Sequence, residues 1–141
     1  MFQPPLPQLP PEDDFLTDGV LRSSRFSDIY FSIENGLEEA RHVFIRGTGL
    51  QHRLSGEGQL VIAETGFGTG LNFLAVIAEV LRQKSRTKID FISVEGCPPS
   101  KQNVAAALRA FPELQKIFGE FLKKWPRRWL GVHHMSFLDG Q

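Results

Sequence analysis

Residues 64–70 read Glu-Thr-Gly-Phe-Gly-Thr-Gly, and they lie between the apolar run Leu60–Ala63 and a segment with helical periodicity. Glycine has no Cβ atom, so the backbone of such a loop can approach a ligand closely. The helix that follows carries partial positive charge at its N-terminus. An acid and three alternate glycines between a strand and a helix therefore predict a nucleotide-type binding turn in an α/β fold. A tight turn without a ligand is the plain structural alternative.

The residues around the glycines separate the possible ligands. A dinucleotide fingerprint needs glycine or alanine three positions after its second glycine, where this chain has Leu71. A phosphate-binding NTPase loop ends in Gly-Lys-Ser/Thr, and no lysine occurs between Glu64 and Arg82. Both patterns are therefore disfavoured. The remaining pattern resembles the first motif of class I (Rossmann-like) S-adenosylmethionine-dependent methyltransferases, with cofactor-binding positions at Glu64, Gly66, Gly68 and Gly70.

A second acid follows at the end of the next predicted strand. Glu95 closes the apolar run that begins at Ile89, at the spacing of a strand–helix–strand unit. A carboxylate at this position can accept hydrogen bonds from both ribose hydroxyls of an adenosine. A lone glutamate at a strand end is usually a solvated charge, but its pairing with the glycine loop favours a role in ribose binding.

Several blocks occur in the order typical of one enzyme family. Over about residues 20–141 the chain resembles the methyltransferase domain of the bifunctional tRNA 5-methylaminomethyl-2-thiouridine biosynthesis proteins, or a stand-alone relative of that domain. The matching blocks are Asp28–Ser32, Asn35–Arg41, Glu64–Phe73, Phe91–Glu95, Trp125-Pro126 and Gly131–His133.

The resemblance implies an activity and a site. It implies that S-adenosylmethionine donates a methyl group to the aminomethyl nitrogen on the wobble uridine of tRNA, in the cytoplasm. Tyr30, Phe31 and Asn35 become candidates for walls of the cofactor pocket, with core packing and helix capping as the alternative. The resemblance implies a flavin cofactor only if a further, flavin-dependent domain is present, and such a domain is a possible partner. The sequence identifies no catalytic residue.

The chain also departs from the family pattern. The family continues its second motif as Glu-Lys-x-Pro, where this chain has Glu95-Gly96-Cys97-Pro98, and it often has His-Arg in place of His133-His134. Family members run on through an Asp-Gly-Phe motif, whereas this sequence ends at Gln141. We therefore expect an incomplete methyltransferase domain over residues 15–141 that exposes an apolar sheet edge. A non-catalytic module that binds S-adenosylmethionine or a partner chain is the alternative function.

The pattern of apolar residues predicts the other elements. We expect central strands over 60–64, 89–94 and 130–137, and a hairpin turn at Asp139-Gly140. Asn35 and Glu38 form a capping-box pattern before a helix that ends near Gly47 and Gly49. The sequence also predicts three further helices: one after the glycine loop that buries Phe73, Val76, Ile77, Val80 and Leu81; one over 101–110 capped by Ser100; and one that buries Leu114, Ile117, Phe118, Phe121 and Leu122.

Composition and charge limit which other functions the chain can have. Lysine plus arginine and aspartate plus glutamate each number 16, so no global charge favours nucleic acid. The basic and aromatic run Lys123–Trp129 suits either a helix C-terminus with core indoles or contact with tRNA, and we favour the helix. The single cysteine, Cys97, is expected to be a small filler residue. We predict no metal site and no membrane span, and a flexible proline-rich lead over residues 1–14.

Overall fold

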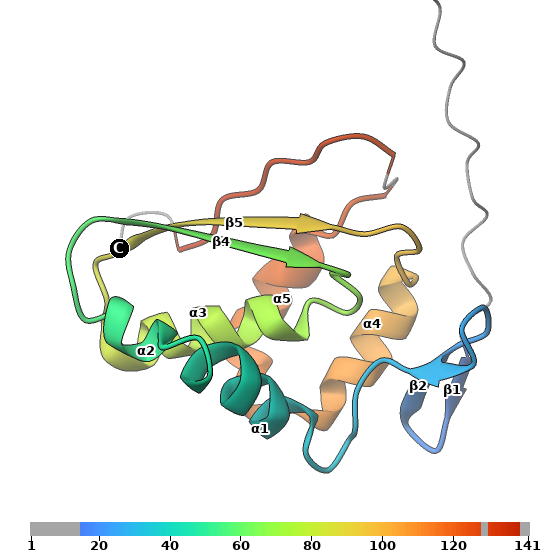
Figure 1. Ribbon diagram of the computed structural model, residues 1–141. Helices are drawn as coiled ribbons and strands as arrows, with labels where there is room; N and C mark the ends of the chain where they lie inside the picture. The colour runs from blue at the N-terminus through green and yellow to red at the C-terminus, as the bar shows by residue number, and fades with distance from the viewer. Residues whose placement is uncertain (1–14, 128–129, 139–141) are drawn as a thin grey trace, which may run out of the picture.

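The computed structural model describes residues 15–127 and 130–138, so the proline-rich lead and the Asp139-Gly140 turn lie outside the described residues. The described chain contains two sheets, joined by helices (Figure 1). The first is a small antiparallel sheet of β1 (Phe15–Thr17), β2 (Val20–Ser23) and β3 (Asp28–Ile29), which the sequence analysis did not predict. The second is a parallel pair of β4 (Gln59–Thr65) and β5 (Lys88–Val94).

The parallel pair and its crossover helix form the centre of the fold. Leu60 pairs with Ile89 and Thr65 pairs with Val94, so the two strands are in register over their whole length. Helix α3 (Leu71–Gln83) makes the crossover that a parallel connection needs. The predicted strands over 60–64 and 89–94 are confirmed. The chain is therefore an α/β protein with its glycine turn at the carboxyl end of β4.

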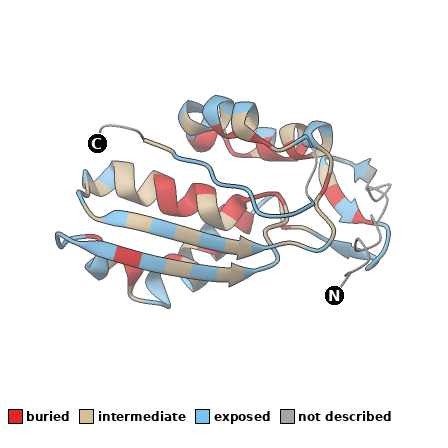
Figure 2. Cartoon of the chain, turned by 90° about the horizontal axis from the view of Figure 1, so that it is seen from above, coloured by how far each residue is buried: buried red, intermediate tan, exposed pale blue. Residues whose placement is uncertain are grey.

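Helices cover one face of the parallel pair. Leu60, Ile62, Ile89 and Phe91 point to the face that packs on η1 (Arg41–Arg46, a π-helical segment), α2 (Leu50–Arg53) and α3. Side chains alternate along each strand, so Val61, Ile92 and Val94 point to the opposite face, where they are exposed (Figure 2). The pair is thus one-sided among the described residues.

The third predicted central strand is wrong. Residues 130–138 form no strand, and Gly131–Ser136 are exposed. A strand needs a hydrogen-bonded neighbour, and neither β4 nor β5 pairs with this segment. The alternating apolar pattern of residues 130–137 is therefore not sufficient to form a strand. The segment contacts the core through Phe137, whose ring centroid lies 4.9 Å from that of Phe73.

Helix α3 buries a different face from the one predicted. Val76 and Ile77 are buried as expected, but Phe73, Val80 and Leu81 are only half-buried. The most deeply buried position is Leu74, which is 0% exposed. The shift arises because α3 packs on two sides. Val76 meets the parallel pair, and Leu74 meets the helices that follow β5.

Two helical segments follow β5 and close the main core. The predicted helix over 101–110 is confirmed as α4 (Lys101–Ala107) and the 3-10 turn η2 (Leu108–Ala110). Ser100 caps α4 as predicted, since its hydroxyl accepts a hydrogen bond from the backbone N–H of Asn103 at 3.1 Å. The 3-10 turn η3 (Pro112–Leu114) leads into α5 (Gln115–Lys124), whose predicted apolar stripe packs into the core.

The capping box before the first helix is not formed. Asn35 does occupy the N-cap position of α1 (Gly36–Ala40), but its side chain makes no capping hydrogen bond. The Glu38 carboxylate instead accepts a hydrogen bond from Arg41, at 2.5 Å. The Glu38 carboxylate binds the Arg41 guanidinium rather than the backbone amide of Asn35, because a charge-assisted hydrogen bond is stronger than one from a neutral amide. Helical structure continues through η1 to Gly47, as expected.

Candidate functional site

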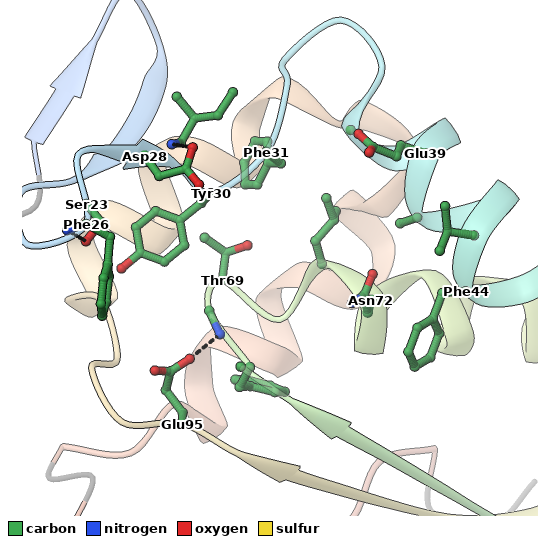
Figure 3. Close-up of a pocket in the computed structure, with 18 of the residues that line it drawn as sticks. Ser23, Phe26, Asp28, Tyr30, Phe31, Glu39, Phe44, Thr69, Asn72 and Glu95 are labelled. Atoms are coloured by element: carbon green, nitrogen blue, oxygen red, sulfur yellow. Dashed lines mark hydrogen bonds between the residues drawn. The ribbon is translucent and has the colours of Figure 1, made fainter.

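A cavity of about 560 Å³ lies where the glycine turn, the end of β5, the segment after β3 and helix α1 meet. Its walls come from segments that are far apart in the sequence (Figure 3). The described residues that line it are Ser23, Phe26, Asp28, Ile29, Tyr30, Phe31, Gly36, Glu39, Ala40, Val43, Phe44, Gly66, Phe67, Gly68, Thr69, Leu71, Asn72, Glu95 and Cys97. The cavity therefore contains the glycine turn and the acid predicted from the sequence.

The glycine turn needs glycine for its backbone shape. Gly66, Gly68 and Gly70 have φ values of +81°, +52° and +77°, a region that other residues rarely adopt. Each of their amides donates to an acceptor in the protein: Gly66 to Val94 O at 2.7 Å, Gly68 to Glu95 Oε2 at 2.7 Å and Gly70 to Phe67 O at 2.8 Å. Acceptors within the protein therefore engage all three glycine amides of the turn.

The three glycines differ in their surroundings. Gly66 has open space where a Cβ would lie, and Gly68 faces Tyr30, whose Cδ1 would be 3.2 Å from an added Cβ. Gly70 lies outside the cavity lining, and an added Cβ there would lie 2.5 Å from Cζ of Phe121. Gly66 and Gly68 thus border the cavity, whereas Gly70 allows close packing of α5.

Glu95 holds the end of β5 to the glycine turn. One carboxylate oxygen accepts from the amide of Gly68, as Figure 3 shows, and the other accepts from the amide of Cys97, both at 2.7 Å. Each carboxylate oxygen has two lone pairs, so both can accept one further hydrogen bond from a ligand. Glu95 is half-buried and lines the cavity.

Glu64 lies beside the cavity rather than in its lining. Its carboxylate accepts hydrogen bonds from Asn72 Nδ2 at 3.2 Å and from Ser93 Oγ at 3.0 Å. Burial raises the pKa of Glu64 above its ordinary value, and these two hydrogen bonds oppose that rise while the charge of Glu95 adds to it. Because Asn72 does line the cavity, Glu64 is connected to it through one side chain.

The aromatic candidates are placed as walls. Tyr30 lies over Gly68, and Phe31 is buried with its ring centroid 5.1 Å from that of Phe111 (Figure 3). Both line the cavity, but Asn35 does not. The structure thus brings Tyr30, Phe31 and Glu95 to the same cavity as the glycine turn.

The charged side chains of the lining have one sign. Asp28, Glu39 and Glu95 line the cavity, and none of the described lining residues is lysine, arginine or histidine. A polyphosphate would meet three carboxylates here, and the Arg25 guanidinium, which contacts the lining residues Phe26 and Cys97, balances only part of that charge, whereas a cationic ligand would be attracted. The cavity therefore suits a ligand that carries positive charge.

Sequence reasoning missed the turn between β2 and β3. Phe26 lines the cavity although it is 65% exposed. Arg25 donates a hydrogen bond to the sulfur of Cys97 at 3.2 Å, so the turn contacts the residues after β5. A single aromatic residue in a polar turn has no periodicity to reveal it. Cys97 also lines the cavity, which its prediction as a filler residue did not anticipate.

The basic and aromatic run near the C-terminus behaves as a helix end where it is described. Lys124 is in the last turn of α5, pairs with Glu120 at 2.7 Å and donates to the carbonyl of Ser136. Trp125 is buried in the core. The side chains of Arg128 and Trp129 lie outside the described residues, so a role in tRNA contact stays a prediction.

Over residues 15–127 and 130–138, no three histidine, cysteine or acidic side chains are grouped so that they could hold a metal ion. Within the same ranges, none of the helices combines the length and apolar character needed to cross a membrane.

Comparison with curated proteins gives consistent relatives. The chain is similar to the tRNA 5-methylaminomethyl-2-thiouridine biosynthesis bifunctional protein MnmC of Leptospira borgpetersenii, with 48% identity over 122 residues. It is also similar to the proteins of that name from Marinobacter nauticus, with 42% identity over 141 residues, and Aeromonas salmonicida, with 40% identity over 134 residues. These matches cover 84%, 95% and 91% of this chain, but only 19%, 22% and 20% of the relatives. No protein-family model matches the sequence.

Proposed function

Because this chain is homologous to the N-terminal part of the MnmC bifunctional proteins, we propose that it is the cofactor-binding part of an S-adenosylmethionine-dependent tRNA methyltransferase. The proposed acceptor is the aminomethyl group on the wobble uridine of tRNA, and the proposed fold is that of class I methyltransferases. The names of the relatives support a role in tRNA modification. This chain spans only about a fifth of the length of these relatives, so we propose for it only part of their activity.

The single observation that carries the cofactor assignment is the charge of the cavity. It is lined by the carboxylates of Asp28, Glu39 and Glu95, with no basic side chain among the described lining residues. S-adenosylmethionine carries a positive sulfonium and no phosphate, unlike NAD or ATP. A cavity beside a glycine turn that attracts cations therefore favours a sulfonium nucleoside over the phosphate-bearing ligands of similar turns.

The geometry gives each residue a proposed role. Glu95 has acceptor capacity left for both ribose hydroxyls, because each oxygen already engaged by a backbone amide retains a lone pair. Gly66 and Gly68 leave room for the ligand over the turn, while Tyr30 and Phe31 form walls. Glu64 orients Asn72, which faces the ligand. Gly70 has no contact with the cavity and instead allows α5 to pack closely against the turn.

The chemistry is an in-line displacement. The cofactor supplies an activated methyl group when it is bound, and the protein must align the acceptor amine and keep water away. The described residues bind and orient the cofactor, and we assign none of them as the group that accepts the amine proton.

Calorimetric titration with S-adenosylhomocysteine tests the site. Glu95→Ala removes the ribose acceptor and one anchor of the glycine turn, so we expect a loss of about 1.5–3 kcal/mol in binding. Gly68→Val places a branched side chain against Tyr30 at a positive φ and should abolish binding. Lys116→Ala is a matched control, since Lys116 is exposed on α5 and outside the lining. Wild-type affinity in both site variants would overturn the assignment.

Methyl transfer is a separate measurement. Radiolabelled S-adenosylmethionine and tRNA that carries 5-aminomethyl-2-thiouridine report transfer directly. Transfer above background that disappears in Glu95→Ala supports the methyltransferase. Tight cofactor binding with no transfer supports the alternative, a non-catalytic S-adenosylmethionine-binding module, because binding alone does not lower the barrier to reaction.

A further inference from the structure

Phe26 is an unusual residue for its position. It is 65% exposed, and it is the only aromatic side chain among the exposed large hydrophobic residues of the described chain. The other exposed apolar residues are aliphatic. Phe26 also lines the cavity, so its ring presents apolar area to whatever enters. Covering such a ring is favourable, and planar ligands cover it best.

A local hydrogen bond shapes the turn that carries Phe26. Its backbone amide donates to the hydroxyl of Ser23 at 3.4 Å, which closes the turn between β2 and β3. The next turn residue, Ser27, has a φ of +53°, a conformation that side chains other than glycine rarely adopt. These two features define the backbone of the turn that presents the ring.

Arg25 attaches this turn to the ribose acid. Its guanidinium lies over the Phe26 ring, 5.7 Å from the centroid, and donates to the sulfur of Cys97. The backbone amide of Cys97 in turn donates to Glu95. The Phe26 ring and the Glu95 carboxylate are therefore linked through a short series of contacts.

These groups match the parts of one nucleoside. A carboxylate binds the ribose hydroxyls, and an aromatic ring beside it offers a surface to the base, which is joined to the ribose by a single bond. We propose that Phe26 stacks on the adenine ring of the cofactor. This inference rests on the proposed function, and it adds a base-recognition residue that the sequence did not indicate.

Binding measurements on three variants test the stacking. Loss of a base–aromatic stack costs about tenfold in affinity. We expect Phe26→Ala to weaken S-adenosylhomocysteine and adenosine by a similar factor of about ten, and Phe26→Trp to retain or improve both affinities. Leu16→Ala is the matched control, because Leu16 is an exposed apolar residue of the same small sheet and lies outside the lining. It should leave both affinities unchanged.

The outcomes separate this inference from the function on which it rests. If wild type binds S-adenosylhomocysteine and Glu95→Ala weakens it while Phe26→Ala does not, the stacking is overturned and the cofactor site stands. If Phe26→Ala instead weakens only an anticodon stem-loop RNA, the ring contacts an acceptor base, and the adenine assignment is overturned. No binding of S-adenosylhomocysteine by wild type would overturn both.

Discussion

Glu38 and Glu39 are neighbours on α1, but their carboxylates meet different surroundings. Glu38 pairs with Arg41 at 2.5 Å and lies 3.9 Å from Arg46, whereas Glu39 lines the cavity. We expect Glu39→Gln to weaken S-adenosylmethionine about two- to fivefold, and S-adenosylhomocysteine less, because only the former carries the sulfonium charge. Glu38→Gln should change neither affinity. Titrations at low and high salt check this, and an equal loss in both variants would contradict it.

The half-buried carboxylate of Glu64 gives a pH prediction. Burial raises its pKa in the folded state above the ordinary value of 4.5, so the folded chain holds the proton more tightly than the unfolded chain. Its contribution to stability is thus complete below 4.5 and is lost as pH rises through the raised pKa. Glu64→Gln should remove this loss and leave a chain at least as stable as wild type at neutral pH.

A control of opposite sign is available on α3. Hydrogen bonds from Arg82 lower the pKa of Glu79, so its stabilising contribution is present above 4.5 and is lost as pH falls. Urea unfolding of Glu64→Gln and Glu79→Gln from about pH 2.5 to 8 should therefore give opposite slopes for the two variants relative to wild type, with the Glu79 effect below pH 4.5 and the Glu64 effect above it. If the free energy of unfolding changes with pH in the same direction for both variants, the raised pKa of Glu64 is contradicted.

Among the elements, the turn between β4 and α3 shows that one motif can hold glycines for two reasons. Gly66→Ala should cost about 1–2 kcal/mol, because only the positive φ opposes a side chain there. Gly70→Ala should cost about 2–5 kcal/mol, since overpacking against Phe121 adds to the same strain. Urea unfolding at constant pH measures the two losses. Equal losses would contradict the assigned packing role of Gly70.

Elements defined by local patterns could be predicted from the sequence, and those decided by distant partners could not. Both parallel strands, α3 and the Ser100 cap follow from apolar periodicity and capping chemistry, which act within a few residues. The strand expected over 130–137 fails because strand pairing needs a neighbour elsewhere in the chain. The cap at Asn35 fails because its backbone, with φ −129° and ψ −2°, lies outside the extended region from which an N-cap side chain reaches the amides of the first turn.

The candidate site divides in the same way. Its glycines and Glu95 belong to a motif with fixed spacing, so the sequence predicts that they meet. Phe26 comes from a turn of the small antiparallel sheet, which docks on α4 through long-range contacts. No local pattern in the sequence encodes that docking.

At the scale of the whole molecule, the parallel pair has an apolar face that none of the described residues covers. Val61, Ile92 and Val94 are more than half exposed on the side opposite the helices. Exposed apolar faces and unpaired strand edges promote association. We expect Ile92→Lys to raise solubility and reduce binding of a hydrophobic dye, with little change in unfolding free energy. Ile62→Lys, on the helix-covered face, should destabilise the fold strongly. Size-exclusion chromatography and unfolding curves check both, and unchanged association in Ile92→Lys would contradict the prediction.

The cavity draws its walls from segments spread between Ser23 and Cys97. None of these segments forms it alone, so a ligand can bind only after distant parts of the chain have docked. A ligand bound in the cavity therefore shifts the equilibrium from partly opened states to the folded state. The resulting gain in the free energy of unfolding grows with the logarithm of ligand concentration. The occupant of the cavity would therefore act as a conformational tether, joining the small antiparallel sheet to the strand–helix–strand unit, so that its supply inside a cell would help to set the lifetime of the folded chain.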